Sequence, residues 1–226
     1  METEILKQRV ALSKIAQDYN FKISKPGISQ ELVSSLKNNG LLETPYLIKK
    51  DKSHEEYIPF TCHKRLEILK EAGMDFIDAF ILNRPSLEVF KKNALLKIFR
   101  GEVGPAGKMR VIFILRKIFA LSEEELLNYN RNVLKVPQEL LSDLNFQERF
   151  LSLPTPLLDY IDERDVPFKT IRDLCLLEDK ILSFLDRCVG NIQIRLNIFK
   201  SIIEYLFDIQ RSGNFSNLDL NSQNFN

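Results

Sequence analysis

The sequence of 226 residues contains no tryptophan, three cysteines and two histidines. Its cysteines (Cys62, Cys175 and Cys188) are too few and too scattered to predict a disulfide framework or a zinc site. Long apolar runs are also missing, since the longest, residues 111–115, is far too short to cross a bilayer. Residues 1–17 carry charge throughout and lack the apolar centre of a signal peptide. We therefore expect a cytoplasmic protein with no metal site and no membrane partner.

The chain also lacks a net charge of either sign, because 32 Lys and Arg oppose 31 Asp and Glu. This balance excludes an overall polycation or an acidic solvating tail, so any electrostatic function depends on uneven distribution. Residues 91–117, here called the basic segment, hold eight basic side chains against Glu102 alone, a charge of +7. These eight are Lys91, Lys92, Lys97, Arg100, Lys108, Arg110, Arg116 and Lys117. Residues 118–190 hold eight basic and 14 acidic side chains.

What is present is enough apolar material for a core, with 44% hydrophobic residues and 16 phenylalanines. The apolar spacing in the first half predicts both helices and strands. Helices are expected over 1–25, closed by Pro26-Gly27, over 30–38 and over 63–72, and strands over 46–48, 57–60 and 76–82. This mixture predicts an α+β fold for residues 1–100.

From residue 86 onward the pattern is helical throughout. Residues 101–107, with three glycines and one proline, predict a linker between two domains. Residues 108–212 then predict an all-helical domain, with helices near 108–120, 122–130, 137–152, 155–163, 168–188 and 192–211. The polar residues 213–226 predict a disordered tail.

The segment 61–73 follows a predicted strand and opens a predicted helix. A helix N-terminus presents unpaired N–H groups, and Lys64 and Arg65 add full charges beside them. Such a turn suits an anion or a phosphate group. A solvated basic first turn without a ligand is the alternative that the turn alone leaves open.

The order of these features resembles the N-terminal domain of the ParB/sulfiredoxin superfamily. The residues that carry the resemblance are Ile28 to Leu32, Gly40 to Pro45, the two strands, the turn, and Gly73 to Phe80. Roughly residues 28–100 are covered. In this family a Gly-x-x-Arg turn binds phosphate.

The resemblance implies a nucleotide site at this turn. Arg65 matches the motif arginine, Lys64 precedes it, and Cys62 stands where the family has glycine. Sulfiredoxin chemistry needs a thiolate one residue later, where this chain has His63, although a shifted alignment would make Cys62 the nucleophile. The implied phosphate- or nucleotide-binding set is Cys62, His63, Lys64, Arg65 and Arg100, and a weakly bound CTP or ATP is the implied cofactor.

The segment 94–105 is similar to a further ParB motif, in which Arg100 matches the arginine and Pro105 the proline. Leu96 and Lys97 occupy the positions of the family's Glu-Asn pair, which supplies ligands for nucleotide-bound Mg²⁺. The resemblance therefore implies nucleotide binding without turnover, and no catalytic residue is assigned.

Residues 120–127 resemble the first helix of the ParB helix-turn-helix, and 136–144 would be its recognition helix. A helix that reads DNA needs Arg, Lys, Asn or Gln toward base edges. This helix offers Gln138, Glu139 and Asp143. DNA binding is therefore expected to be weak or non-specific, through the basic segment on the phosphate backbone.

The stretch 192–211 carries Ile192, Leu196, Phe199, Ile203 and Leu206 at alternating steps of four and three. Such a stripe must be buried, either in its own domain or against a second copy in a homodimer. The two alternatives have equal support in the sequence.

The sequence thus predicts a ParB-like, nucleoid-associated protein of chromosome or plasmid partition. Two alternatives stay open: a nucleotide-dependent phosphotransferase or nuclease of the same superfamily, and a scaffold that has lost both ligands.

Overall fold

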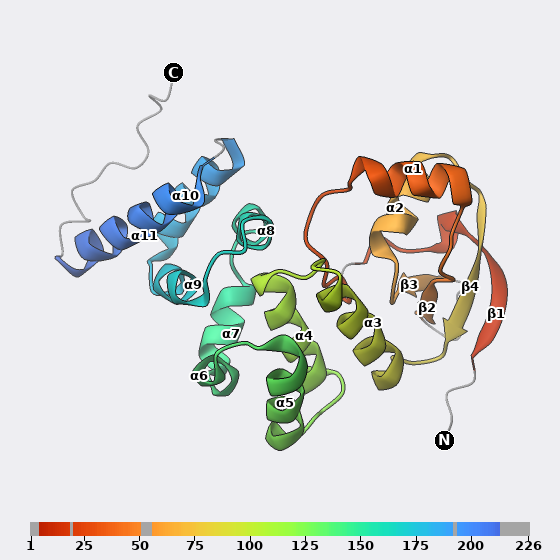
Figure 1. The fold of residues 1–226 in the computed structure, drawn as a ribbon, viewed down its shortest axis with the longest axis horizontal. Helices are drawn as coiled ribbons and strands as arrows, with labels where there is room; N and C mark the ends of the chain where they lie inside the picture. The colour runs from red at the N-terminus through yellow and green to blue at the C-terminus, as the bar shows by residue number, and fades with distance from the viewer. Residues whose placement is uncertain (1–4, 19, 51–55, 192–193, 213–226) are drawn as a thin grey trace. The chain divides into compact units, whose positions relative to one another are not determined.

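The computed structural model describes residues 5–18, 20–50, 56–191 and 194–212. The chain divides after Arg100 into two compact units, unit 1 up to Arg100 and unit 2 from Gly101 onward. Unit 1 combines a sheet with helices, whereas the described part of unit 2 is helical (Figure 1). The fold is therefore α+β, as the sequence predicts.

The sheet of unit 1 has the strand order β1-β4-β2-β3. Its strands are β1 (Leu6–Ala11), β2 (Tyr46–Lys49), β3 (Tyr57–Pro59) and β4 (Phe76–Leu82). β4 pairs antiparallel with β1 and parallel with β2, and β2 pairs antiparallel with β3. β3 therefore lies at one edge of the sheet and delivers the chain directly to the turn that opens the next helix.

The α-helices in the described part of unit 1 are α1 (Gln30–Asn39), α2 (His63–Glu71) and α3 (Leu87–Phe99). Ser29 and Ser86 cap α1 and α3 by accepting from backbone N–H groups three residues on. Leu66 and Leu69 of α2 join the main core with Leu47 and Ala79 of the sheet. α3 packs through Phe90, whose ring lies 6.2 Å from that of Phe60.

The predicted helix over 1–25 is wrong. β1 occupies this region and continues into a single 3-10 turn, η1 (Leu12–Lys14), and Ile15 then bridges to Tyr57. β1 pairs along its whole length with β4, some 70 positions later in the chain. Such a non-local contact leaves no signature in local spacing, and the apolar Leu6 is half-exposed on this edge strand.

Unit 2 is built around α4 (Pro105–Lys117), whose Met109, Val111, Ile112 and Leu115 are fully buried. It is followed by α5 (Glu123–Tyr129), a π-helical turn η2 (Asn130–Leu134), α6 (Gln138–Ser142), α7 (Leu144–Leu151), α8 (Thr155–Glu163), α9 (Phe168–Cys175), α10 (Asp179–Asn191) and α11 (Leu196–Arg211). None of the helices in the described residues is long and apolar enough to span a membrane.

Two helices expected as single elements are each divided. The stretch 137–152 breaks at Asp143, whose carboxylate caps α7 by accepting from Phe146 N–H at 2.9 Å. The stretch 168–188 breaks at the turn of residues 176–178 between α9 and α10. At Asp143 a local cap competes with helix continuation. At 176–178 the contacts are non-local, since Gln210 of the last helix accepts from Glu178 N–H and donates to the carbonyl of Leu176, both at 2.9 Å. In both places an unbroken apolar stripe hides the interruption.

The glycine- and proline-rich stretch 101–107 is only partly a connection, because its last three residues form the first turn of α4. Asp162 of α8, which is buried, accepts from the N–H groups of Ala106 at 2.7 Å and Gly107 at 3.3 Å. A Cβ at Gly104 would lie 2.8 Å from Asp162 Cα, so only glycine fits there. The glycines of this segment therefore allow α8 to approach the start of α4.

α11 buries its stripe within its own unit. Phe199, Ile203 and Leu206 are 0–7% exposed, and the ring of Phe199 lies 4.6 Å from that of Tyr160 in α8. For these three residues burial favours the alternative in which the stripe belongs to its own domain, whereas Leu196 is half-buried and Ile198 and Tyr205 are exposed on the same helix. The homodimer stays a prediction. Ile192 of the stripe and the tail 213–226 lie outside the described residues.

Candidate anion site at the start of α2

The turn between β3 and α2 is fixed to the neighbouring strand. The N–H groups of Phe60 and Thr61 both donate to the carbonyl of Tyr46, at 2.9 and 3.2 Å. The N–H of Tyr46 in turn donates to Thr61 Oγ1 at 2.9 Å. The end of the strand thus sets the position from which α2 begins.

Cys62 is the residue between strand and helix, and its backbone is left-handed, with φ 59° and ψ 24°. For a residue with a Cβ this conformation costs about 1–2 kcal/mol, whereas glycine adopts it freely. Cys62 also gives α2 no side-chain cap. The backbone therefore has a conformation that suits glycine, the residue that the resemblance expects here.

Arg65 lies beside Cys62 one turn into the helix. Its Nη1 is 2.7 Å from Glu43 Oε2 and 3.6 Å from Cys62 Sγ. The arginine side chain is 24% exposed, so it is reachable from solvent. An anion at this turn must share Arg65 with Glu43 or displace it.

Lys64, the second cation predicted for the turn, donates to the backbone carbonyl of Pro26 at 3.4 Å. It therefore lies beside the segment that leads into α1. Arg100, also predicted for this site, is the exposed C-cap of α3 at the end of unit 1.

The Cys62 thiol is buried, and burial raises its pKa. The hydrogen bond with Thr61 and the charge of Arg65 lower that pKa, while the charge of Glu43 raises it. The net effect is a raised pKa. A thiol with a raised pKa stays protonated at neutral pH, and the protonated form is a poor nucleophile. The structure therefore argues against the alternative in which Cys62 performs thiolate chemistry.

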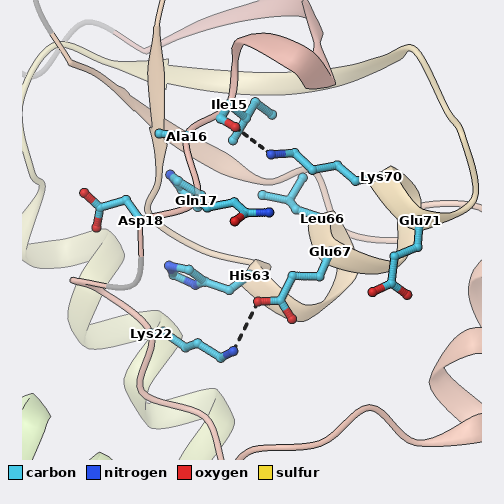
Figure 2. A pocket seen from close by; sticks show the side chains of 11 residues that line it. Ile15, Ala16, Gln17, Asp18, Lys22, His63, Leu66, Glu67, Lys70 and Glu71 are labelled. Atoms are coloured by element: carbon cyan, nitrogen blue, oxygen red, sulfur yellow. Dashed lines mark hydrogen bonds and ion pairs between the residues drawn. The ribbon is translucent and has the colours of Figure 1, made fainter. Parts of the chain in front are cut away.

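The His63 side chain does not join the anion site. It is 4% exposed and lines a pocket with Glu67 and Lys70 of the same helix (Figure 2). Residues 63, 67 and 70 share one helix face, and Arg65 lies about 200° away from His63 around the axis. The part of His63 that suits an anion is its backbone N–H, which lies at the N-terminus of α2.

The basic segment is divided between the two units after Arg100. Lys92 is exposed and Lys91 half-buried on α3, while the charge of Lys97 reaches His63 and contributes to lowering the pKa of that imidazole. In unit 2, Lys108 and Arg110 are partly exposed on α4. Lys117 lies 3.5 Å from Glu148.

Arg116, predicted to contact DNA, is instead a structural residue with a side chain 11% exposed. Its guanidinium donates to Glu123 at 3.0 and 3.1 Å, to Gln147 Oε1 at 2.5 Å and to the carbonyl of Leu141 at 2.7 Å. These contacts tie α4 to α5, α6 and α7. A guanidinium committed to these contacts is less available to a phosphate group than the other basic side chains of the segment.

The predicted recognition helix is only the five-residue α6, with Leu140 and Leu141 buried. Gln138, Glu139 and Asp143 are exposed. The exposed surface of α6 is thus polar and acidic, which suits a solvated face better than one that approaches phosphate. In the described residues no three His, Cys, Asp or Glu side chains gather as metal ligands.

Sequence reasoning missed Glu43 as the partner of Arg65 and Lys22 as the partner of Glu67. Each pair joins residues far apart in the chain, by 22 and 45 positions. The acid within the stretch Gly40 to Pro45 was the one available signal for the first pair.

The sequence matches no protein-family model and no curated protein. The structure is similar to those of ParB proteins. One is the C-terminally truncated chromosome-partitioning protein ParB from Caulobacter crescentus complexed to the centromeric parS site, with 11% identity and a TM-score of 0.38 over 88% of this chain and 99% of that one. The same protein complexed with CTP-gamma-S gives 13% identity and 0.34 over 82% and 99%. A pNOB8-like ParB N-domain gives 17% and 0.42 over 95% and 98%.

Proposed function

We propose that the chain is a ParB-like, DNA-associated protein of chromosome or plasmid partition that binds the phosphate backbone through basic residues of α3 and α4. The observation that carries the proposal is the concentration of charge, since seven basic residues besides the engaged Arg116 fall in the 27 positions 91–117 against one acid. A cluster of this kind supplies affinity for phosphates without base-specific contacts.

We also propose that the turn at Cys62 and Arg65 binds a nucleotide weakly and does not hydrolyse it. The N-terminus of α2 and Arg65 favour a phosphate group. The Cys62 side chain and the competing Glu43 carboxylate weaken the contact. Leu96 and Lys97 occupy positions where Mg²⁺ ligands are expected, and the raised pKa of Cys62 disfavours covalent catalysis, so the enzymatic alternative has less support.

The DNA proposal is tested by titrating duplex DNA into the full chain over a range of salt concentrations. Replacing Lys91, Lys92 and Arg100 by Ala should weaken binding and reduce the slope of log affinity against log salt by roughly 2.7, about 0.9 per phosphate contact. Lys97 is kept because its charge acts near His63.

The matched control replaces three exposed basic residues by Ala in residues 118–190, where acidic side chains outnumber basic ones: Lys169, Arg172 and Lys180. It changes the net charge equally and should leave the slope unchanged. Undiminished DNA binding by the α3 variant, or equal losses in both variants, would contradict a role for the α3 residues.

A further inference from the structure

A pocket of about 330 Å³ lies along one face of α2 (Figure 2). Helix geometry places Arg65 on the opposite face. Side chains of α2 form one wall, and residues 15–18 with Lys22, after β1, form the other. A pocket of this volume is at the small end of the range for ligand sites. It belongs entirely to unit 1 and is separate from the anion site.

The wall of this pocket contains a buried hydrogen-bond acceptor without a partner. The His63 imidazole donates to the backbone of Pro59, and Nε2 has no partner in the described chain, so Nδ1 carries the proton. Burial, followed by the charges of Lys97 and Lys22, lowers the pKa of His63 to about 3. Nε2 is therefore an unprotonated acceptor at neutral pH, which calls for an N–H or O–H donor.

The pocket combines side chains of both signs. Lys22 Nζ lies 3.1 Å from Glu67 Oε1, and Lys70 Nζ donates to the carbonyl of Ile15 at 2.6 Å. Asp18 and Glu71 complete the charged lining. Three carboxylates against two ammonium groups disfavour a phosphate, and two lysines disfavour a simple cation.

We propose that this pocket binds a small zwitterion of the free amino-acid class. The ligand's ammonium group donates to His63 Nε2 and to the Glu67 carboxylate, and its carboxylate accepts from Lys70, which lies at the end of the pocket away from Lys22 (Figure 2). Such a ligand supplies the donor that Nε2 lacks and matches both charges of the lining. Because Arg65 lies on the other face of α2, the inference is independent of nucleotide or DNA binding.

The test is a thermal-shift screen of the full chain against each natural L-amino acid at millimolar concentration. At least one should raise the melting temperature saturably, because a ligand bound to the native state stabilises it by mass action. The corresponding amine without the carboxylate, and the carboxylic acid without the amine, should each bind at least tenfold more weakly. Equal binding of either fragment would overturn the zwitterion assignment.

A second readout follows the histidines directly. The chain has only two, so the ¹⁵N spectrum of histidine-labelled protein resolves them readily. The amino acid should shift the His63 Nε2 resonance toward that of a hydrogen-bonded nitrogen. Glu67→Gln should weaken binding at least tenfold, and Glu88→Gln, at an exposed position of α3 in the same unit, should leave it unchanged. An unmoved Nε2 resonance with every amino acid would overturn the proposal, whatever the variants do.

Discussion

Cys62 combines a left-handed backbone, which suits glycine, with a side chain that stands at the start of α2. A phosphate group at the helix N-terminus needs close backbone approach, and a Cβ with a sulfur atom occupies part of that space. Cys62→Gly should keep the backbone, since φ is 59°, and open the turn. We expect this variant to bind CTP and ATP more tightly than the wild type in calorimetric titration.

Arg65→Ala should have the opposite effect in the same titration. Losing one charge-assisted contact should weaken nucleotide binding by roughly tenfold or more. Arg84→Ala removes an exposed cation from the same unit and serves as the matched control. Magnesium-dependent hydrolysis by the wild type would contradict the proposal of binding without turnover.

Burial of neutral His63 makes stability depend on pH. In the unfolded chain its pKa takes the ordinary value of 6.5, and in the folded chain it is about 3. The unfolded state therefore binds the proton first, so the contribution of His63 is full above pH 6.5 and is lost as the pH falls toward 3. Between about pH 7 and about pH 5.5, the free energy of unfolding should fall by about 1 kcal/mol from this group.

The measurement is urea denaturation of wild type and His63→Gln at the two pH values. The variant should lose this part of the pH dependence, and His54→Gln, which removes the other histidine, should retain it. A wild-type pH dependence identical to that of His63→Gln would show that His63 is not held neutral in the folded state.

At the scale of elements, the N-terminus of α4 depends on a residue from α8. Gly104 supplies no side-chain cap and Pro105 has no N–H, so the Asp162 carboxylate satisfies the next two donors, Ala106 and Gly107. Asp162→Ala should destabilise the protein by about 3 kcal/mol, because it leaves buried N–H groups unpaired. Glu163→Gln, at an exposed neighbouring position, should change the urea midpoint little; equal midpoints for Asp162→Ala and wild type would contradict the capping role.

The sequence predicted those elements whose signals are local. Ser29 and Ser122 lie beside the backbone groups that they cap, and the helices that follow them begin where expected. β1 was missed because its partner β4 is distant in the chain, and the break at Asp143 because the apolar stripe continues across it. The α2 turn was predicted, but the pairing of Arg65 with Glu43 and the turning away of His63 depend on packing between segments.

On the scale of the whole molecule, the basic residues of 91–117 are divided between the two units and differ in their exposure to solvent. The basic side chains of α3 belong to unit 1, whereas Arg116 in unit 2 serves its interior. Counting charge along the chain therefore overstates the cations available to a phosphate backbone. The apolar stripe of α11 has the corresponding limit: its spacing along the chain does not tell whether it packs inside its own unit or against a second copy.

The burial of α11 within unit 2 predicts how its stripe responds to substitution. Phe199 is fully buried against Tyr160, so Phe199→Ala should lower the free energy of unfolding by about 3–5 kcal/mol. Because the contact is internal, the loss should be the same at every protein concentration, whereas a seam between two copies makes stability concentration-dependent. Tyr205→Ala, at a position 66% exposed on the same helix, should change stability little.

The measurement is urea unfolding at protein concentrations a hundredfold apart. For a seam between two copies, each tenfold change in concentration should change the apparent free energy of unfolding by roughly 1.4 kcal/mol, whereas an internal contact gives no change. A midpoint that rises with concentration in the wild type and not in Phe199→Ala would show that the stripe forms an intermolecular seam.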